Sequence, residues 1–266
     1  MQASSKRNGA TAIKIDGLIY EKDGQVARLT LNRPQVLNAL DYPAKVALDG
    51  IARMIAKDDD VRVVAINGAG RAFCTGVDLK ALSTGRIDAR NFSLWEIAMR
   101  RLETMDKIVI CLMHGYSLGG GVQFGLACDL RVSTPTSKFG LPAAKEGLVP
   151  GLSVWRLARA IGMGRAKELA LWGNMIDGAG AHRIGLVSHL VSDENRDAEF
   201  EAYIASAVGI ASLGARATKQ AMSLAQDMDW QEAFDLYMGL QRKGLESDDF
   251  HEAMAAYREG RDARWR

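Results

Sequence analysis

Two glycine-bearing turns are the parts of this sequence whose residue types could do chemistry. The first lies in RAFCTGVDLK (residues 71–80) and the second in HGYSLGGGVQFGLACDLR (residues 114–131), and each follows an apolar run. Three consecutive glycines (119–121) at the start of a helix let ligand atoms approach the backbone, because no Cβ stands in the way. The first N–H groups of such a helix lack an internal partner. The turns therefore predict either a site for an anion or oxyanion or tight packing of a helix against a strand.

The apolar runs around these turns predict the elements that position them. A hairpin is expected around Asp23-Gly24, and buried strands are expected over residues 61–67, 107–115 and 130–133. Helices are expected over residues 42–56, 92–105 and 123–128. Strands that alternate with helices indicate an α/β architecture. After Pro150 the strand signals stop, and helices are expected over residues 154–171, 198–228 and 248–264.

This pattern divides the chain into three expected parts. Residues 1–14 are predicted to be a flexible tail, residues 15–204 the α/β core and residues 205–266 a C-terminal helical region. The first residues lack the apolar stretch of a secretory signal. No apolar run reaches the ~18 residues that a membrane span requires. We therefore expect neither secretion nor a membrane partner.

Composition narrows the classes of function. The 34 basic and 32 acidic residues leave a net charge of only +2, which does not predict a nucleic-acid partner or a membrane-attracting face. Cys74, Cys111 and Cys128 sit in apolar runs and fit no metal-binding spacing. They are expected to be buried thiols in a reducing, cytoplasmic setting, and no metal site is predicted.

The two turns and three further segments resemble the crotonase (enoyl-CoA hydratase/isomerase) superfamily. LNRPQVLNAL (31–40) resembles its opening segment, FGLPAAKEGLVPG (139–151) its third active-site segment, and GRAKELALWGNMIDGAGAHRIGLVSHLV (164–191) the region that follows. The closing stretch SDDFHEAMAAYREGRDARW (247–265) is also similar. The resemblance covers roughly residues 18–265. It implies a spiral of ββα units with a helical C-terminal region, and trimers or pairs of trimers.

The resemblance implies an enzyme that acts on acyl-CoA thioesters. The N–H groups of Val77 and Gly120 would hold the thioester oxygen while it becomes an enolate-like anion. Coenzyme A would arrive as part of the substrate, so no separate cofactor is expected. The residues implied to line its pocket are Phe73, Thr75, Val77, Asp78, Leu79, Lys80 and Gly120.

Two positions depart from the pattern of that family. Its hydratases carry one glutamate three residues after the middle glycine and another after the proline of the third segment, where this chain has Gln123 and Ala143. Gln123 can donate and accept hydrogen bonds but cannot act as a general base, so we expect it to orient substrate or water. Glu146 would share the face of Ala143 if this segment is helical, and it is our candidate for proton transfer. Glu96 is a second candidate, and an ion-paired or solvated carboxylate is the alternative for Glu146.

Three other functions stay open. The first is another thioester reaction on the same scaffold, such as decarboxylation, retro-aldol cleavage or oxygenation. The second is a non-catalytic acyl-CoA-binding protein, because both usual glutamates are missing. The third is a hydrolase, because residues 115–119 fit G-x-S-x-G with Ser117 as nucleophile, and His182 and His189 follow downstream. A small turn residue is the alternative for Ser117.

The remaining candidates concern the acyl group. Phe92, Trp95 and Met99 suggest an apolar pocket, although apolar helix residues more often belong to the core. His114 ends a predicted buried strand and is expected to be a hydrogen-bonded structural residue. Nothing in the sequence identifies the acyl group itself.

Overall fold

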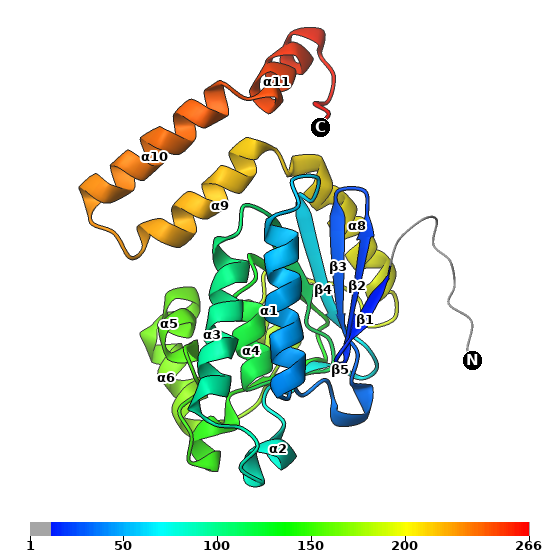
Figure 1. Cartoon of the computed structure of the whole chain (residues 1–266), viewed down its shortest axis with the longest axis vertical. Coiled ribbons are helices and arrows are strands. Elements are labelled where there is room, and N and C mark those ends of the chain that lie inside the picture. The colour runs from blue at the N-terminus through cyan, green and yellow to red at the C-terminus, as the bar shows by residue number, and fades with distance from the viewer. Residues whose placement is uncertain (1–11, 266) are drawn as a thin grey trace.

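Two sheets and a surrounding set of helices make up the protein in a computed structural model that describes residues 12–265 (Figure 1). The larger sheet has the strand order β1-β2-β3-β4-β6-β8-β11, and the smaller sheet has the order β10-β9-β7-β5. The helices α1 (Tyr42–Ala56) and α3 (Ala89–Thr104) lie side by side in front of the larger sheet. The helices α9 (Leu213–Ala225), α10 (Trp230–Leu245) and α11 (Asp248–Glu259) extend beyond the end of the sheets.

The larger sheet begins with two antiparallel pairings and continues with parallel strands. Its strands are β1 (Ile13–Ile15), β2 (Leu18–Asp23), β3 (Val26–Leu31), β4 (Val63–Gly68), β6 (Ile108–Leu112), β8 (Leu130–Ser133) and β11 (His189–Leu190). The expected hairpin at Asp23-Gly24 is confirmed, because β2 pairs antiparallel with β3 and Asp23 faces Val26. From β3 to β11 every pairing is parallel. Parallel strands need crossover connections, which the intervening helices supply.

The smaller sheet brings the two glycine turns together. Its strands are β5 (Ala72–Cys74), β7 (Tyr116–Leu118), β9 (Lys138–Gly140) and β10 (Ile176–Asp177). The strands β5 and β7 are parallel neighbours, and each of them leads into one glycine turn. Because the carboxyl ends of parallel neighbours lie at the same edge of a sheet, the two turns meet there.

The helices are capped where the sequence supplies acceptors. Asp41 accepts a hydrogen bond from the N–H of Ala44 at the start of α1, and Asp88 caps α3. The other helical segments are η1 (Pro34–Val36), α2 (Leu79–Ser83), α4 (Gly120–Leu126), η2 (Pro142–Glu146), α5 (Ser153–Ile161), α6 (Met163–Trp172), α7 (Gly178–Arg183), α8 (Arg196–Ile210), α9 (Leu213–Ala225), α10 (Trp230–Leu245) and α11 (Asp248–Glu259).

Several predicted boundaries were wrong, each for a local reason. The expected loop after β4 contains β5, and two short strands, β10 and β11, occur after Pro150. The expected helix over 154–171 is two helices, because Gly162 has a φ of +77° and breaks the run between α5 and α6. The helix expected over 198–228 is likewise divided, between α8 and α9. The strands β5, β10 and β11 were missed because each has only two or three residues, too few to show the alternation of apolar and polar residues that marks a strand.

The predicted division of the chain stays a prediction, and its boundaries can be placed on the observed helices and strands. The boundary between residues 204 and 205 falls inside α8, whose residues Phe200, Ile204 and Ala207 are buried in an apolar cluster with strands of the larger sheet. The tail predicted for residues 1–14 lies mostly outside the described residues, but Ile13 and Lys14 already pair with β2.

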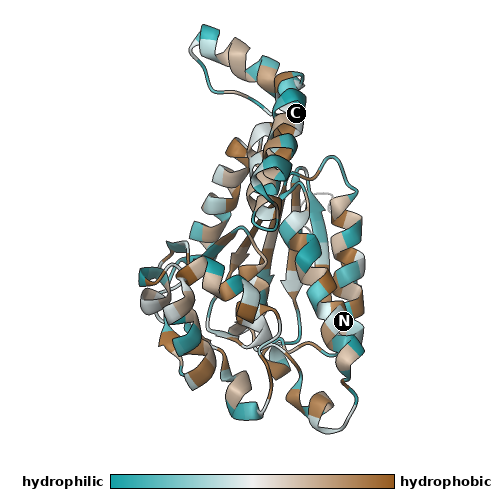
Figure 2. Ribbon diagram, turned by 90° about the vertical axis from the view of Figure 1, so that its left-hand side faces the viewer, coloured by the Kyte–Doolittle hydropathy of each residue, from teal (hydrophilic) through white to brown (hydrophobic). Residues whose placement is uncertain are grey.

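The C-terminal helices carry apolar side chains away from the core. None of the residues of α10 is buried, although it has an apolar side, and hydrophobic turns are visible on these projecting helices (Figure 2). Within residues 12–265, no helix is both long and apolar enough to cross a membrane. Exposed apolar side chains gathered on one side of a helix are typical of surfaces that contact other proteins.

Candidate active site

Gly76 and Gly120 form the closest contact between the two turns. A Cβ on Gly76 would lie only 2.5 Å from the backbone nitrogen of Gly120, and Gly76 has a φ of +87°. Any other residue at position 76 would force the two turns apart and strain its own backbone. The glycine of the first turn is thus required for close approach of the two backbones.

Two backbone N–H groups stand side by side at this contact without acceptors. Gly120 is the first residue of α4, so its N–H has no partner within the helix. Val77 follows Gly76 and forms an isolated bridge with Leu40. In that bridge Leu40 donates to the carbonyl of Gly76 and accepts from Asp78, which leaves the N–H of Val77 unused. Among the described residues, nothing accepts a hydrogen bond from either N–H.

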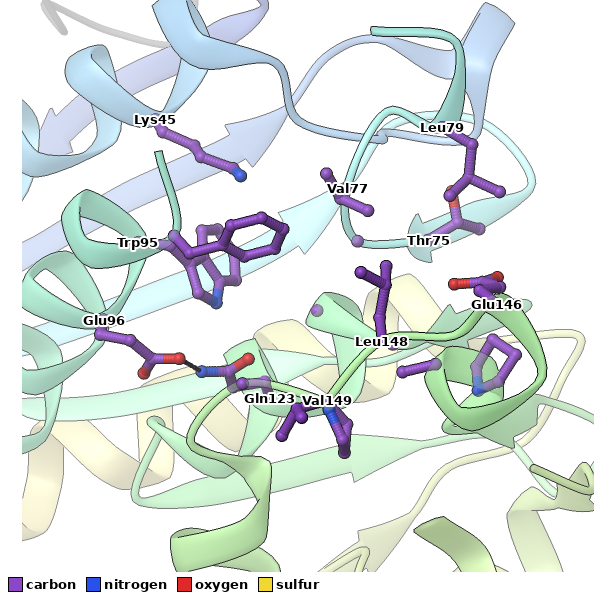
Figure 3. Close-up of a pocket in the computed structure, with 18 residues that line it drawn as sticks. Lys45, Thr75, Val77, Leu79, Trp95, Glu96, Gln123, Glu146, Leu148 and Val149 are labelled. Carbon is purple, nitrogen blue, oxygen red and sulfur yellow. Dashed lines mark hydrogen bonds between the residues drawn. The ribbon is translucent and has the colours of Figure 1, made fainter. Parts of the chain in front are cut away.

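A pocket of about 690 Å³, including the part open to solvent, adjoins both N–H groups (Figure 3). Its walls come from α1, from both glycine turns, from α3 and α4, and from the segment 142–151. The lining residues are Lys45, Thr75, Gly76, Val77, Leu79, Phe92, Trp95, Glu96, Gly119, Gly120, Gln123, Pro142, Ala143, Glu146, Leu148, Val149, Pro150 and Gly151. The predicted set Val77, Gly120, Gln123 and Glu146 therefore lies around one cavity.

Glu96 and Gln123 form the polar pair at one side of this pocket. The Gln123 side-chain amide donates a hydrogen bond to Oε1 of Glu96, and the backbone N–H of Leu152 donates to the same oxygen over 2.8 Å. The buried guanidinium of Arg156 donates to Oε2 of Glu96 over 2.9 Å. Because a carboxylate only accepts, Glu96 fixes which end of the Gln123 amide faces it. The side-chain oxygen Oε1 of Gln123 accepts no hydrogen bond from the described residues.

Gly151 closes the backbone over this pair. A Cβ on Gly151 would lie 2.7 Å from a carboxylate oxygen of Glu96 and 2.8 Å from the amide oxygen of Gln123. The residue also has a φ of +50°. Glycine is therefore the residue that lets the chain pass this close to both side chains.

Glu146 lies across the pocket from this pair, near Leu79 (Figure 3). Glu146 is the last residue of the 3-10 helix η2, which also contains Ala143. The segment that holds both residues is therefore helical, as the prediction for Glu146 required. Glu146 is exposed, and no donor among the described residues binds its carboxylate. Ala143 is nearly buried and also lines the pocket, with only a methyl group there.

The residues implied to bind coenzyme A are distributed unequally. Thr75 and Leu79 line the pocket together with Val77 and Gly120. Phe73 does not, because it is fully buried and packs against Phe124 with ring centroids 5.6 Å apart. Asp78 uses its side chain to cap α2 through the N–H of Ala81. Lys80 is exposed on α2, outside the lining.

The hydrolase hypothesis is not supported by the surroundings of Ser117. This residue is completely buried, and its hydroxyl has no hydrogen-bond partner among the described residues, so no histidine there activates it. His114 is the structural residue that was expected, since its Nε2 lies 3.0 Å from the carbonyl oxygen of Gly70. Burial lowers the pKa of His114. Phe92 and Trp95 line the pocket, whereas Met99 belongs to the core.

Lys45 is the pocket residue that sequence reasoning missed. It projects from the buried face of α1, is only 3% exposed, and donates a hydrogen bond to Oδ1 of Asn91. Its ammonium lies 5.5 Å from the ring centroid of Phe92 and 5.7 Å from that of Trp95. The sequence holds a signal for this burial. Lys45 lies three residues before Leu48 and seven before Ala52, and this spacing puts it on the apolar face of the helix.

Comparison with known proteins assigns this arrangement to a family. The sequence model of the enoyl-CoA hydratase/isomerase family matches residues 21–266. This chain belongs to the enoyl-CoA hydratase/isomerase family. Its resemblance to crotonases is thereby confirmed, and so is an enzyme of the hydratase/isomerase type.

Individual members of the enoyl-CoA hydratase/isomerase family match over almost the whole chain. A short-chain-enoyl-CoA hydratase of Clostridium acetobutylicum is 32% identical over 253 residues, covering 94% of this chain and 97% of that one. An (E)-benzylidenesuccinyl-CoA hydratase of Thauera aromatica is 34% identical and covers 78% of this chain and 82% of its own length. The crystal structure of an enoyl-CoA hydratase from Bacillus anthracis superposes with a TM-score of 0.87 at 26% identity, covering 94% of this chain and 98% of that chain. The predicted crotonase-like fold with a helical C-terminal region is confirmed.

Proposed function

We propose that the protein adds water across the double bond of a 2-enoyl-CoA thioester. The observation that carries this proposal is the pair of unused N–H groups at Val77 and Gly120, which face one pocket together with two carboxylates. Preorganised donors of this kind stabilise an oxyanion where it forms. The names of the relatives support enoyl-CoA thioesters as the substrate class, but they differ in the acyl group, from short-chain to benzylidenesuccinyl.

In the proposed reaction the pocket holds the thioester carbonyl and one water. The water oxygen bonds to Cβ, and one proton of the water passes to a carboxylate. The electron pair of the Cα–Cβ double bond moves between Cα and the carbonyl carbon, and the carbonyl π pair moves onto the thioester oxygen. The N–H groups of Val77 and Gly120 hold the resulting enolate. Return of the proton from the carboxylate to Cα completes the hydration, so one carboxylate is enough to carry the proton.

Glu146 is the carboxylate that we assign to proton transfer. No donor among the described residues competes for its lone pairs, whereas three donors, including the guanidinium of Arg156, already hold Glu96. Glu96 is therefore assigned as a positioning residue. Because Glu96 binds the side-chain nitrogen of Gln123, the side-chain oxygen of Gln123 points away from Glu96. That oxygen can accept a hydrogen bond from water or substrate.

Coenzyme A is proposed to enter as part of the substrate, with no separate cofactor. Thr75, Leu79 and the exposed Lys80 lie on or beside the first turn, where its phosphates and pantetheine arm would pass. Homotrimers or pairs of trimers are proposed as the assembly, because α10 has an apolar side and none of its residues is buried. The cytoplasmic location stays a prediction.

The first experiment follows the conjugated enoyl-thioester absorbance during incubation with crotonyl-CoA and with a longer or aromatic 2-enoyl-CoA. The wild type should remove this absorbance, and Glu146→Gln should lower kcat by roughly 100-fold or more with little change in KM. Glu194→Gln, which changes an exposed carboxylate that does not line the pocket, serves as the matched control.

A wild type that binds these esters but leaves their absorbance unchanged would contradict hydration. The missing glutamates at positions 123 and 143 would then favour decarboxylation, retro-aldol cleavage, oxygenation or a binding role on the same oxyanion site.

A further inference from the structure

Lys45 is a buried ammonium in the pocket that the proposed hydration does not use. Among the described residues, only the Asn91 carbonyl oxygen accepts from it, and no carboxylate lies within ion-pairing distance. An ammonium group has three donors. A buried charge without a partner of opposite sign is expensive, so its presence in a ligand pocket calls for a reason.

The neighbours of Lys45 add donors rather than acceptors. The amide nitrogen of Asn91 is buried and has no hydrogen-bond partner among the described residues, and it belongs to the same amide that accepts from Lys45. The indole N–H of Trp95, whose ring lines the pocket, is a further buried donor without a partner in this part of the chain. Buried polar groups in native proteins normally find partners. What this end of the pocket lacks is a hydrogen-bond acceptor, preferably an anionic one.

The surroundings restrict where such an acceptor can come from. Lys45 points into the pocket beside the rings of Phe92 and Trp95 (Figure 3), and it is almost inaccessible to solvent. The phosphates of coenzyme A are large, strongly hydrated anions and do not suit an aromatic-walled enclosure. A carboxylate on the acyl group, carried in by the apolar chain, suits both the rings and the ammonium.

We propose that Lys45, with the amide of Asn91, binds a carboxylate on the acyl group, so that the substrate is the coenzyme A monothioester of an unsaturated dicarboxylic acid. This inference rests on the proposed acyl-CoA function and names the substrate class within it. Burial lowers the pKa of Lys45 to about 8, so the charged form still predominates at neutral pH. Lys45 is thus a charged donor at pH 7 rather than a base.

Binding of saturated esters tests this inference without requiring turnover. Calorimetry at pH 7 compares pairs of equal chain length, namely butyryl- with succinyl-CoA, valeryl- with glutaryl-CoA, and hexanoyl- with adipoyl-CoA. At the chain length that reaches Lys45, the wild type should bind the carboxylate member at least about 10-fold more tightly. Lys45→Met should abolish or reverse this preference, while Lys57→Met, an exposed lysine at the end of the same helix, should keep it.

The outcomes separate the two proposals. Equal binding within every pair would overturn the carboxylate inference and leave the hydratase proposal standing. A preference that survives in Lys45→Met would overturn the assignment to Lys45. If no ester of any pair binds, the acyl-CoA function fails, and this inference fails with it. Thermal melting of Lys45→Met establishes that the variant is folded before its binding is interpreted.

Discussion

The side chain of Gln123 donates a hydrogen bond to the carboxylate of Glu96, which lies 27 residues earlier in the chain. Gln123 stands where hydratases of this family carry a glutamate, and Glu96 comes from a different helix. The pocket therefore contains a carboxylate beside this position, but it is held by Arg156 and by the backbone N–H of Leu152. This hydrogen bond is the basis for the roles proposed for Glu96 and Gln123.

Glu96 and Gln123 should act as one unit in catalysis. Because Glu96 is proposed to act by orienting Gln123, Gln123→Ala should lower kcat by roughly 10- to 100-fold, and adding Glu96→Ala should cost little more. Steady-state kinetics of the two single variants and the double variant measure this. Multiplicative losses would show instead that Glu96 works independently, for example as the proton carrier.

Replacement of Gly76 should remove the oxyanion site. A Cβ at this position meets the backbone nitrogen of Gly120 at 2.5 Å, so Gly76→Ala must displace one of the two N–H groups. Loss of one such donor lowers kcat by roughly 100-fold or more. Gly50→Ala is the matched control, because nothing lies within 4 Å of its added methyl group in α1. Full activity in Gly76→Ala would argue against an oxyanion site at this contact.

Lys45→Met should stabilise the protein at neutral pH while it impairs recognition of the substrate. Burial lowers the folded-state pKa of Lys45 from 10.5 to about 8, so below pH 8 the folded state bears the cost of a desolvated charge. Removal of that cost should raise the free energy of unfolding by on the order of 1–3 kcal/mol at pH 7.

The gain in stability of Lys45→Met over the wild type should depend on pH. Between pH 8 and 10.5 the wild-type folded state loses its proton before the unfolded state does, so the wild type gains stability with rising pH. The advantage of Lys45→Met should therefore shrink over that interval. Denaturant unfolding at pH 7 and at pH 10 measures it, with Lys57→Met as the exposed control. A pH-independent difference would mean that Lys45 binds its proton equally in the folded and unfolded states, so that burial does not lower its pKa.

The exposed side of α10 should hold the oligomer together. Trp230 is 74% exposed and stacks on Phe234 with ring centroids 5.2 Å apart, on a helix without buried residues. Light scattering should give a mass about three or six times the 28.9 kDa of the chain. The double variant Trp230→Glu/Phe234→Glu should reduce that mass, whereas Lys57→Glu at the end of α1 should not. A monomeric wild type would refute this assembly.

The sequence by itself determined the family, the main elements and the two turns. The period of apolar residues predicted α1 over residues 42–56 and β8 over residues 130–133 with the bounds that the structure has. The glycines at positions 76 and 120 were informative because their need for close backbone approach is a property of the residue type. Such signals are local, so they survive in the linear chain.

The tertiary structure decided which side chains share the pocket. Glu96 ranked below Glu146 in the sequence, because nothing local shows that α3 places it against Gln123 and Arg156. Lys45 was not a candidate from the sequence, because only the packing of α1 against α3 encloses it with Asn91. The burial of a side chain and its choice of hydrogen-bond partners depend on segments that are distant in the sequence. Their effects on charge and hydrogen bonding therefore appear only once the chain is folded.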